Sequence, residues 1–140
     1  MSTLCQAGSR RWLDWLLRLI VALEVPIYFG AALLHLGARI SLGPLVLAVP
    51  NPIPPASVVE TILGIAAVAN LAALLRGRRS PMRVTLGIQL FLLVGVSLGM
   101  VSLALRVGPP PSPDWNIHYV MLAAIAAAFL VLILLKAQKT

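Results

Sequence analysis

The segment that most constrains the fold runs from Arg18 to Arg39, where the twenty residues between the two arginines are almost all apolar. At about 1.5 Å of rise per residue, a helix of this length crosses a bilayer core of roughly 30 Å. The same segment contains Glu24 near its middle, Pro26 two residues later and His35 near its end. Ionisable side chains at that depth are costly, so they normally face a bundle interior, a partner or a water-filled cavity.

Three further apolar runs are long enough to span a membrane, at residues 56–75, 84–105 and 117–135. The chain has 140 residues, of which 60% are hydrophobic and 11% charged, so four crossings take up most of it. We therefore predict one domain, residues 1–140, that is an all-α, integral membrane four-helix transmembrane bundle with helices at about 16–38, 56–75, 84–105 and 117–135. Any activity is expected inside the bundle or in its short loops.

The placement of the basic residues predicts the topology. Nine of the eleven arginines and lysines lie before the first span, between the second and third, or after the fourth, and only Arg39 and Arg106 lie on the other side. By the positive-inside rule, both termini are cytoplasmic. The net charge of +7 is therefore interpreted as a topology signal and not as a nucleic-acid surface. Cys5, the single cysteine, falls in the predicted cytoplasmic tail, so no intrachain disulfide can form.

Several local patterns refine this prediction. Residues 1–11 are expected to form a disordered or interfacial tail, followed by Trp12 and Trp15 at the inner membrane interface. The proline- and glycine-rich loop at residues 40–55 is expected either to lie in the interface or to fold over the bundle mouth as a lid. The second helix opens with Ser57-Val-Val-Glu60, a capping-box pattern.

Two other patterns concern the helix interiors. Pro26 lacks an N–H group and frees the carbonyl of Ala22, which favours a small hydrated pocket beside Glu24. Gly95 and Gly99 form a small-xxx-small face on the third helix, which permits close contact with another helix, within the bundle or in a homo-oligomer.

The predicted topology sorts the polar residues of the spans into two layers by depth. Glu24, Asn70 and Gln89 fall in the inner layer, and His35, Glu60 and His118 fall in the outer one. Glu24 and His35 are eleven residues apart, close to three helical turns, so both point to one face with Tyr28 between them. A shared polar seam along the first helix is therefore expected.

Two interpretations of these residues remain open. In the functional one, the candidate catalytic residues are Glu24, Glu60 and His35, and the candidate substrate-binding residues are Tyr28, Asn70, Gln89 and His118. In the structural one, Glu24 is a neutral acid that holds helices together through Asn70, Gln89 or the Ala22 carbonyl, and Glu60 is only a helix cap. The two histidines and Glu60 contain the ingredients of a metal site, but no ligand spacing supports one. Neither a metal nor a cofactor is expected.

Three short stretches resemble the DoxX-like group of small four-helix membrane proteins: Leu16-Leu-Arg-Leu-Ile20, Val59-Glu60-Thr-Ile-Leu-Gly64 and His118-Tyr119. The resemblance implies a multi-pass protein of the bacterial cytoplasmic membrane, in some cases linked to redox or quinone-associated systems. Glu24-Val-Pro26 departs from the pattern of that group. The layout is also similar to membrane isomerases of the emopamil-binding kind, in which acidic residues inside a helical bundle act on lipophilic substrates.

The leading hypothesis is an intramembrane polar pocket centred on Glu24 that binds a lipophilic small molecule. Such a pocket could transform its ligand by isomerase-, cyclase- or hydrolase-type acid/base chemistry, which needs only positioned groups. The alternative is a non-catalytic accessory or assembly subunit of a membrane complex. An ion or proton pathway is a third hypothesis, and it would require a homo-oligomer formed through Gly95 and Gly99. The expected partners are the lipid bilayer, the ligand and either a second copy or another membrane subunit.

Overall fold

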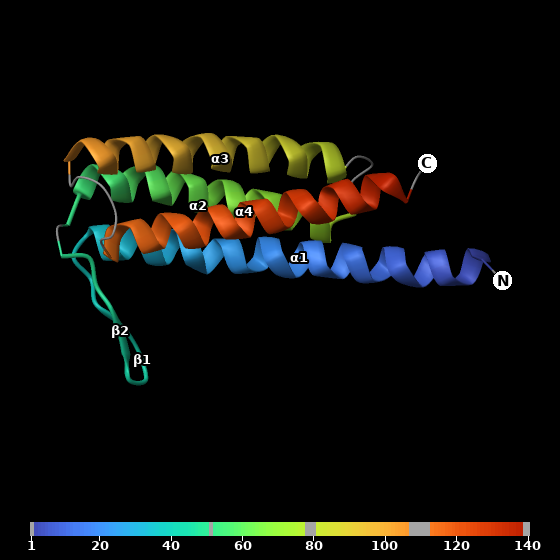
Figure 1. Ribbon diagram of the computed structural model, residues 1–140, viewed down its shortest axis with the longest axis horizontal. Coiled ribbons are helices and arrows are strands. Elements are labelled where there is room, and N and C mark those ends of the chain that lie inside the picture. The colour runs from blue at the N-terminus through green and yellow to red at the C-terminus, as the bar shows by residue number, and fades with distance from the viewer. Residues whose placement is uncertain (1, 51, 78–80, 107–112, 139–140) are drawn as a thin grey trace.

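The computed structural model describes residues 2–50, 52–77, 81–106 and 113–138 of the chain. Its four helices are α1 (Ser2–His35), α2 (Pro54–Leu75), α3 (Pro81–Arg106) and α4 (Pro113–Ala137), and two short strands follow α1. The helices run alternately up and down (Figure 1). Helix α1 packs against α2 and α4, and α3 packs against the same two helices, so the four form a closed ring around one axis.

All four helices are long and apolar enough to cross a membrane, over Arg10–His35, Pro54–Leu75, Met82–Arg106 and Trp115–Ala137. Large apolar side chains cover the outside of the bundle, among them Leu33, Ile62, Leu98 and Ile133. A surface this apolar is a liability in water, whereas hydrocarbon is its natural solvent. The arrangement therefore indicates a multi-pass membrane protein and agrees with the predicted all-α fold.

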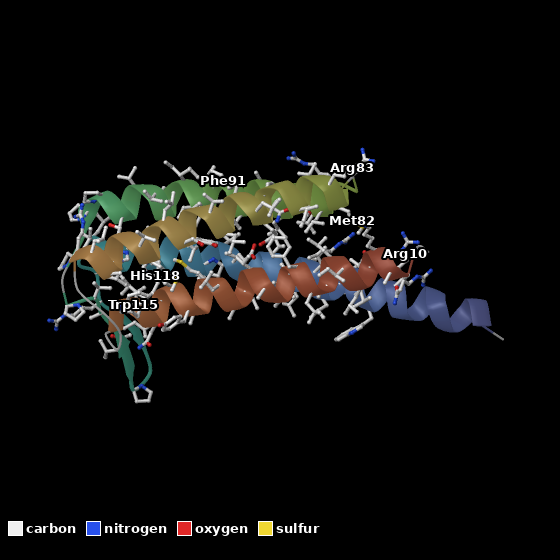
Figure 2. The ribbon with its side chains drawn as sticks, turned by 45° about the horizontal axis from the view of Figure 1, so that its top comes forward. Arg10, Met82, Arg83, Phe91, Trp115 and His118 are labelled. Atoms are coloured by element: carbon white, nitrogen blue, oxygen red, sulfur yellow. The ribbon has the colours of Figure 1, made fainter. Side chains whose placement is uncertain are left out.

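The two ends of the bundle differ in composition. Arg10 and Arg83 lie at one end, together with Met82, and Trp115 and His118 lie at the other (Figure 2). We call the first the basic end and the second the hairpin end, because the two strands also lie there (Figure 1). The depths predicted from the sequence place these residues in the same two groups.

The first helix is longer than predicted at its start and shorter at its end. It begins at Ser2 instead of near residue 16, and its first turns extend beyond the other helices (Figure 1). Of the two alternatives for residues 1–11, the disordered tail is therefore wrong, and the interfacial one stays a prediction. It ends at His35 instead of residue 38 because Gly37 adopts a positive φ of 89°. The amide groups of Gly37 and Ala38 donate to the carbonyls of Leu34 and Leu33, as in a Schellman cap.

The loop after α1 forms a β-hairpin, which the sequence did not predict. Strands β1 (Ile40–Leu42) and β2 (Leu45–Leu47) pair antiparallel, with Ser41 opposite Val46. The two-residue turn starts at Gly43, whose φ of 62° suits a hairpin turn with glycine in the first central position. The hairpin projects sideways from the bundle and does not cross its end (Figure 1), so residues 40–47 form no lid, whereas Ile53 and Pro55 of the same predicted loop line a pocket at this end.

Two apolar clusters divide the core along the axis. The one toward the basic end includes Leu17, Val21, Leu74, Ala128 and Leu135. The one toward the hairpin end is formed by Tyr28, Ala31, Leu63, Ala67, Leu92, Val96, Met121 and Ile125. On each of α1, α2 and α3, the inner polar residue falls at the boundary of these clusters. The core is therefore two apolar blocks with a polar layer between them.

Side chains of neighbouring helices pack against both Gly95 and Gly99 inside the bundle. A Cβ atom on Gly95 would lie 2.7 Å from Leu63 Cδ2, and one on Gly99 would lie 2.8 Å from His118 Nε2. The predicted close helix contact is confirmed, with α2 at Gly95 and with α4 at Gly99. The same contacts make the predicted oligomerisation through this face wrong, because the face is already covered by the protein's own side chains.

Gly95→Ala should destabilise the bundle because Leu63 is buried and must move to admit the new methyl group. Overpacking of this kind costs about 1 to 3 kcal/mol. Gly87→Ala is the matched control on the same helix, because a Cβ there meets nothing within 4 Å. Thermal unfolding in detergent should give a lower Tm for Gly95→Ala than for Gly87→Ala. Equal Tm values would show that α2 and α3 are not in close contact at this level.

Candidate functional site

The inner polar layer is built around Glu24, which is completely buried on α1. The amide Nε2 of Gln89, on α3, donates to both carboxylate oxygens of Glu24, at 2.9 Å from Oε1 and 2.8 Å from Oε2. The two residues were predicted to share a layer, and the structure confirms that they meet.

Asn70 lies at the same depth on α2. The buried contact between His35 and Glu60 pins α1 and α2 against each other at the hairpin end. Glu24 is eleven residues before His35 and Asn70 is ten residues after Glu60, so in antiparallel helices they are level to within about one residue's rise of 1.5 Å. Asn70 is fully buried, and neither of its side-chain polar atoms has a hydrogen-bond partner in the protein.

Other polar atoms around Glu24 are also unpaired. Tyr28 and Thr85 are fully buried, and neither hydroxyl has a hydrogen-bond partner in the protein; the same holds for Oε1 of Gln89. Most buried polar groups in folded proteins are hydrogen-bonded, and each exception needs a physical explanation. The inner layer is therefore a polar site whose hydrogen-bonding capacity the protein itself only partly uses.

Pro26 and Glu24 lie on different faces of α1. Pro26 is exposed on α1, whereas Glu24 and Tyr28 are buried. Ala22 lies one turn below Pro26, on the outward face, and lines a shallow apolar groove with Trp12, Trp15 and Leu19. The side chains of Pro26 and Glu24 therefore point to opposite sides of α1, because a two-residue step turns an α-helix by about 200°.

The outer layer is centred on a direct contact between His35 and Glu60. Nδ1 of His35 lies 2.7 Å from Oε2 of Glu60, and both side chains are buried. His35 comes from the last turn of α1 and Glu60 from the second turn of α2. Glu24, Tyr28 and His35 are thus all buried on one face of α1, as the spacing predicted.

The predicted capping box at the start of α2 is wrong. The helix begins at Pro54, three residues before Ser57, and its cap position Ile53 makes no side-chain cap hydrogen bond. Ser57 instead donates from Oγ to the carbonyl of Pro54 at 2.7 Å. Glu60 is therefore not explained by capping, and its partner is His35.

His118 completes the outer layer from the first turns of α4. Its ring centroid lies 6.4 Å from that of His35, with the rings inclined at 62°. The absence of a side chain at Gly99 leaves the space that its Nε2 edge occupies. The three residues predicted to share this layer are therefore brought together from three helices.

A pocket of about 250 Å³ opens beside this layer, between α2, α3 and α4. Its polar lining includes His35, Glu60, His118, Ser102 and Arg106. The rest of its wall is mostly apolar, and Leu63, Val96 and Met121 close it toward the bundle centre. Concave apolar sites with a few convergent polar groups are the usual form of small-molecule sites.

Glu24, Tyr28, Asn70 and Gln89 do not line this pocket. The apolar cluster that contains Leu63, Val96 and Met121 also contains Tyr28, so it lies between the pocket and the inner layer. The sequence grouped the polar residues correctly by depth, and this pocket opens at the outer layer and not at Glu24, where the sequence predicted one.

Within the described residues, no three histidine, cysteine, aspartate or glutamate side chains are arranged to hold a metal ion. In the outer layer, His35 and Glu60 form a hydrogen-bonded pair, and the His118 ring lies beside His35. Their chemistry is that of proton donors and acceptors.

Comparison of the chain with protein-family models, with curated proteins and with solved structures gave no match. The resemblance to DoxX-like proteins stays a prediction.

Three residues of these sites were missed from the sequence. Thr85 lies one turn before Gln89 on α3, so helical spacing could have placed it on the same buried face. Ser102 and Arg106 line the pocket one and two turns beyond Leu98. Their contribution depends on how α3 packs against α4, which the sequence does not reveal.

The contact between His35 and Glu60 should show strong energetic coupling. Glu60→Leu leaves His35 buried without its carboxylate, which costs about 1 to 3 kcal/mol for a lost hydrogen bond and more for a broken ion pair. The double variant His35→Leu/Glu60→Leu removes both polar groups and should recover part of this loss. A double-mutant cycle of unfolding free energies in detergent measures the coupling. Simple addition of the two single losses would contradict the pairing.

Proposed function

We propose that this protein binds a small lipophilic molecule in the pocket at the hairpin end, and that the His35–Glu60 pair carries out acid/base chemistry on it. The observation that carries the proposal is the convergence of His35, Glu60 and His118 on one mostly apolar pocket. An apolar wall suits the body of a lipophilic ligand, and the polar group at one side orients its polar end.

The proposed chemistry follows from the carboxylate beside the imidazole. A carboxylate at Nδ1 holds the ring in one tautomer and orients it, so the pair can accept a proton and return it. Removal of a proton from one position of a ligand and its return at another is an isomerisation, and it needs no cofactor. His118 and Arg106 supply further donors for a polar group of the ligand.

This proposal moves the acid/base role from Glu24 to the outer layer. The reason is access: Glu60 and His35 line the pocket, whereas Glu24 lies beyond an apolar cluster. A catalytic group must come within hydrogen-bond reach of the proton that it transfers. In this conformation, Glu24 does not meet that requirement for a ligand in the pocket.

The alternative is a non-catalytic accessory subunit of a membrane complex. Its support is that both polar layers join helices to one another, through Gln89 with Glu24 and through His35 with Glu60. Interhelical hydrogen bonds of this kind stabilise bundles without any chemistry. In this alternative, the pocket would receive a side chain of a partner subunit.

Native mass spectrometry of the protein released gently from its own membranes should find a bound lipophile. Ser102→Leu places a bulky side chain on the pocket wall and should abolish this mass. Ser97→Leu is the matched control, because Ser97 is exposed on the same helix and does not line the pocket. It should retain the ligand.

Equal retention of the ligand by both variants would show that the ligand binds elsewhere. A co-purifying protein that is lost with Ser102→Leu, in the absence of any small molecule, would establish the subunit alternative. Either result would reject the proposed ligand site.

The proposed setting is the bacterial cytoplasmic membrane, with both termini and the basic end on the cytoplasmic side. Its support is the concentration of basic residues, including Arg10, Arg76, Arg83 and Lys136, at one end of the bundle, with Arg39 and Arg106 at the other. Membrane proteins retain such residues on the cytoplasmic side.

The single cysteine provides the test of this topology. A membrane-impermeant maleimide should label Cys5 in inverted membrane vesicles and not in intact spheroplasts. Cys5→Ser carrying a new cysteine at Arg39 is the control, and it should show the opposite pattern. Labelling of Cys5 from outside would reverse the proposed orientation.

A further inference from the structure

The Glu24 carboxylate is buried without a positively charged side chain to neutralise it. Glu24 is fully buried in the middle of an apolar bundle, and its hydrogen-bond partner is the neutral amide of Gln89. Among the residues that the structure describes, the acid–base contact is that of His35 with Glu60, and no basic side chain contacts Glu24. A buried carboxylate without a counter-charge is very costly.

Unpaired oxygen atoms lie in the inner layer on three helices. Oδ1 of Asn70, Oε1 of Gln89 and the hydroxyl of Tyr28 have no hydrogen-bond partner in the protein, and all three side chains are fully buried. They come from three helices, so their co-location results from the fold and not from local sequence. Leaving such groups unsatisfied costs free energy at each one.

The geometry brings these oxygens toward one region. Gln89 is in direct contact with Glu24, and Asn70 is at the same depth on the neighbouring helix. Tyr28 starts one turn closer to the hairpin end. Side chains on an α-helix lean toward its N-terminus, so the Tyr28 ring leans back toward the level of Glu24. Thr85 lies one turn to the other side.

We propose that this inner layer is a binding site for a sodium ion, held by the Glu24 carboxylate with the side-chain oxygens of Asn70, Gln89 and Tyr28. Carboxylate, amide and hydroxyl oxygens are the ligands that hard cations prefer. With one carboxylate in the layer, a single positive charge makes the site neutral, whereas a divalent ion would leave a buried excess charge. Ion sites of membrane proteins are commonly formed by polar groups near the middle of the bilayer.

A protonated Glu24 accounts for fewer of the unpaired polar atoms than a bound cation does. The proton would neutralise the carboxylate, but the single O–H could satisfy only one of the two unpaired amide oxygens, Oδ1 of Asn70 and Oε1 of Gln89. A coordinated cation engages both of them at once. The proposal does not depend on the ligand proposed for the hairpin-end pocket, because the two layers are separated by the apolar cluster of Leu63, Val96 and Met121.

The test is sodium binding to the full-length protein in detergent or nanodiscs. Wild-type protein should bind one radiolabelled sodium ion per chain with saturation. Its Tm should rise by several degrees as sodium chloride replaces choline chloride at constant ionic strength and pH, because binding to the folded state alone stabilises it. Glu24→Gln should lose both effects. Asp14→Asn is the matched control, since Asp14 is an exposed carboxylate on the same helix, and it should keep both.

A second variant keeps the test decisive if Glu24→Gln does not fold. Asn70→Leu removes one proposed ligand oxygen and should weaken sodium binding by about tenfold or more. Unchanged sodium affinity in Asn70→Leu, or a sodium response that survives in Glu24→Gln, would overturn the proposal. So would a wild-type Tm that responds to pH and not to sodium, because it would identify a protonated Glu24 instead of a bound cation.

Discussion

The bundle depends on how it accommodates one buried carboxylate. The hydrogen bonds from Gln89 to Glu24 join α1 and α3, which otherwise pack mainly against α2 and α4. In hydrocarbon, apolar side chains gain little by choosing one helix face over another, because lipid is as apolar as they are. A polar contact across the bundle therefore sets the rotation of both helices, and the two apolar clusters pack on either side of it.

The outer polar layer sets the relative height of α1 and α2, which the inner layer does not set. The contact of His35 with Glu60 joins the end of α1 to the start of α2 and sets their relative height. Gly95 and Gly99 then let α3 approach Leu63 and His118 closely. The pocket lies where these constraints meet, so its polar residues are positioned by the same contacts that align the helices. The rotation of the helices, their relative height and their distance of approach are thus set by different residues.

The sequence predicted the number of helices and the depth of each polar residue because both follow from hydrophobic length and helical rise. It failed where the outcome depends on contacts between distant segments. Glu60 fits a capping box in the local sequence. The helix begins about one turn before that box, however, so Glu60 lies inside α2, where it contacts His35. Gly95 and Gly99 fit an oligomer face as well as an internal one, and only the packing of Leu63 and His118 decides between them. The position of the pocket follows from packing too, and neither hydrophobic length nor helical rise encodes it.

The two polar layers differ in a way that separates their roles. At the hairpin end, His35 and Glu60 contact one another and also line a pocket, so a molecule in the pocket can contact them. In the inner layer, the polar groups keep unused oxygens yet are fully buried between apolar clusters. A ligand that binds these unpaired oxygens must enter while the helices assemble or when the helices move apart. Exchange at Glu24 is therefore tied to motion of whole helices, whereas exchange at His35 and Glu60 is not. This difference favours a transient ligand at the hairpin end and a long-lived one in the inner layer.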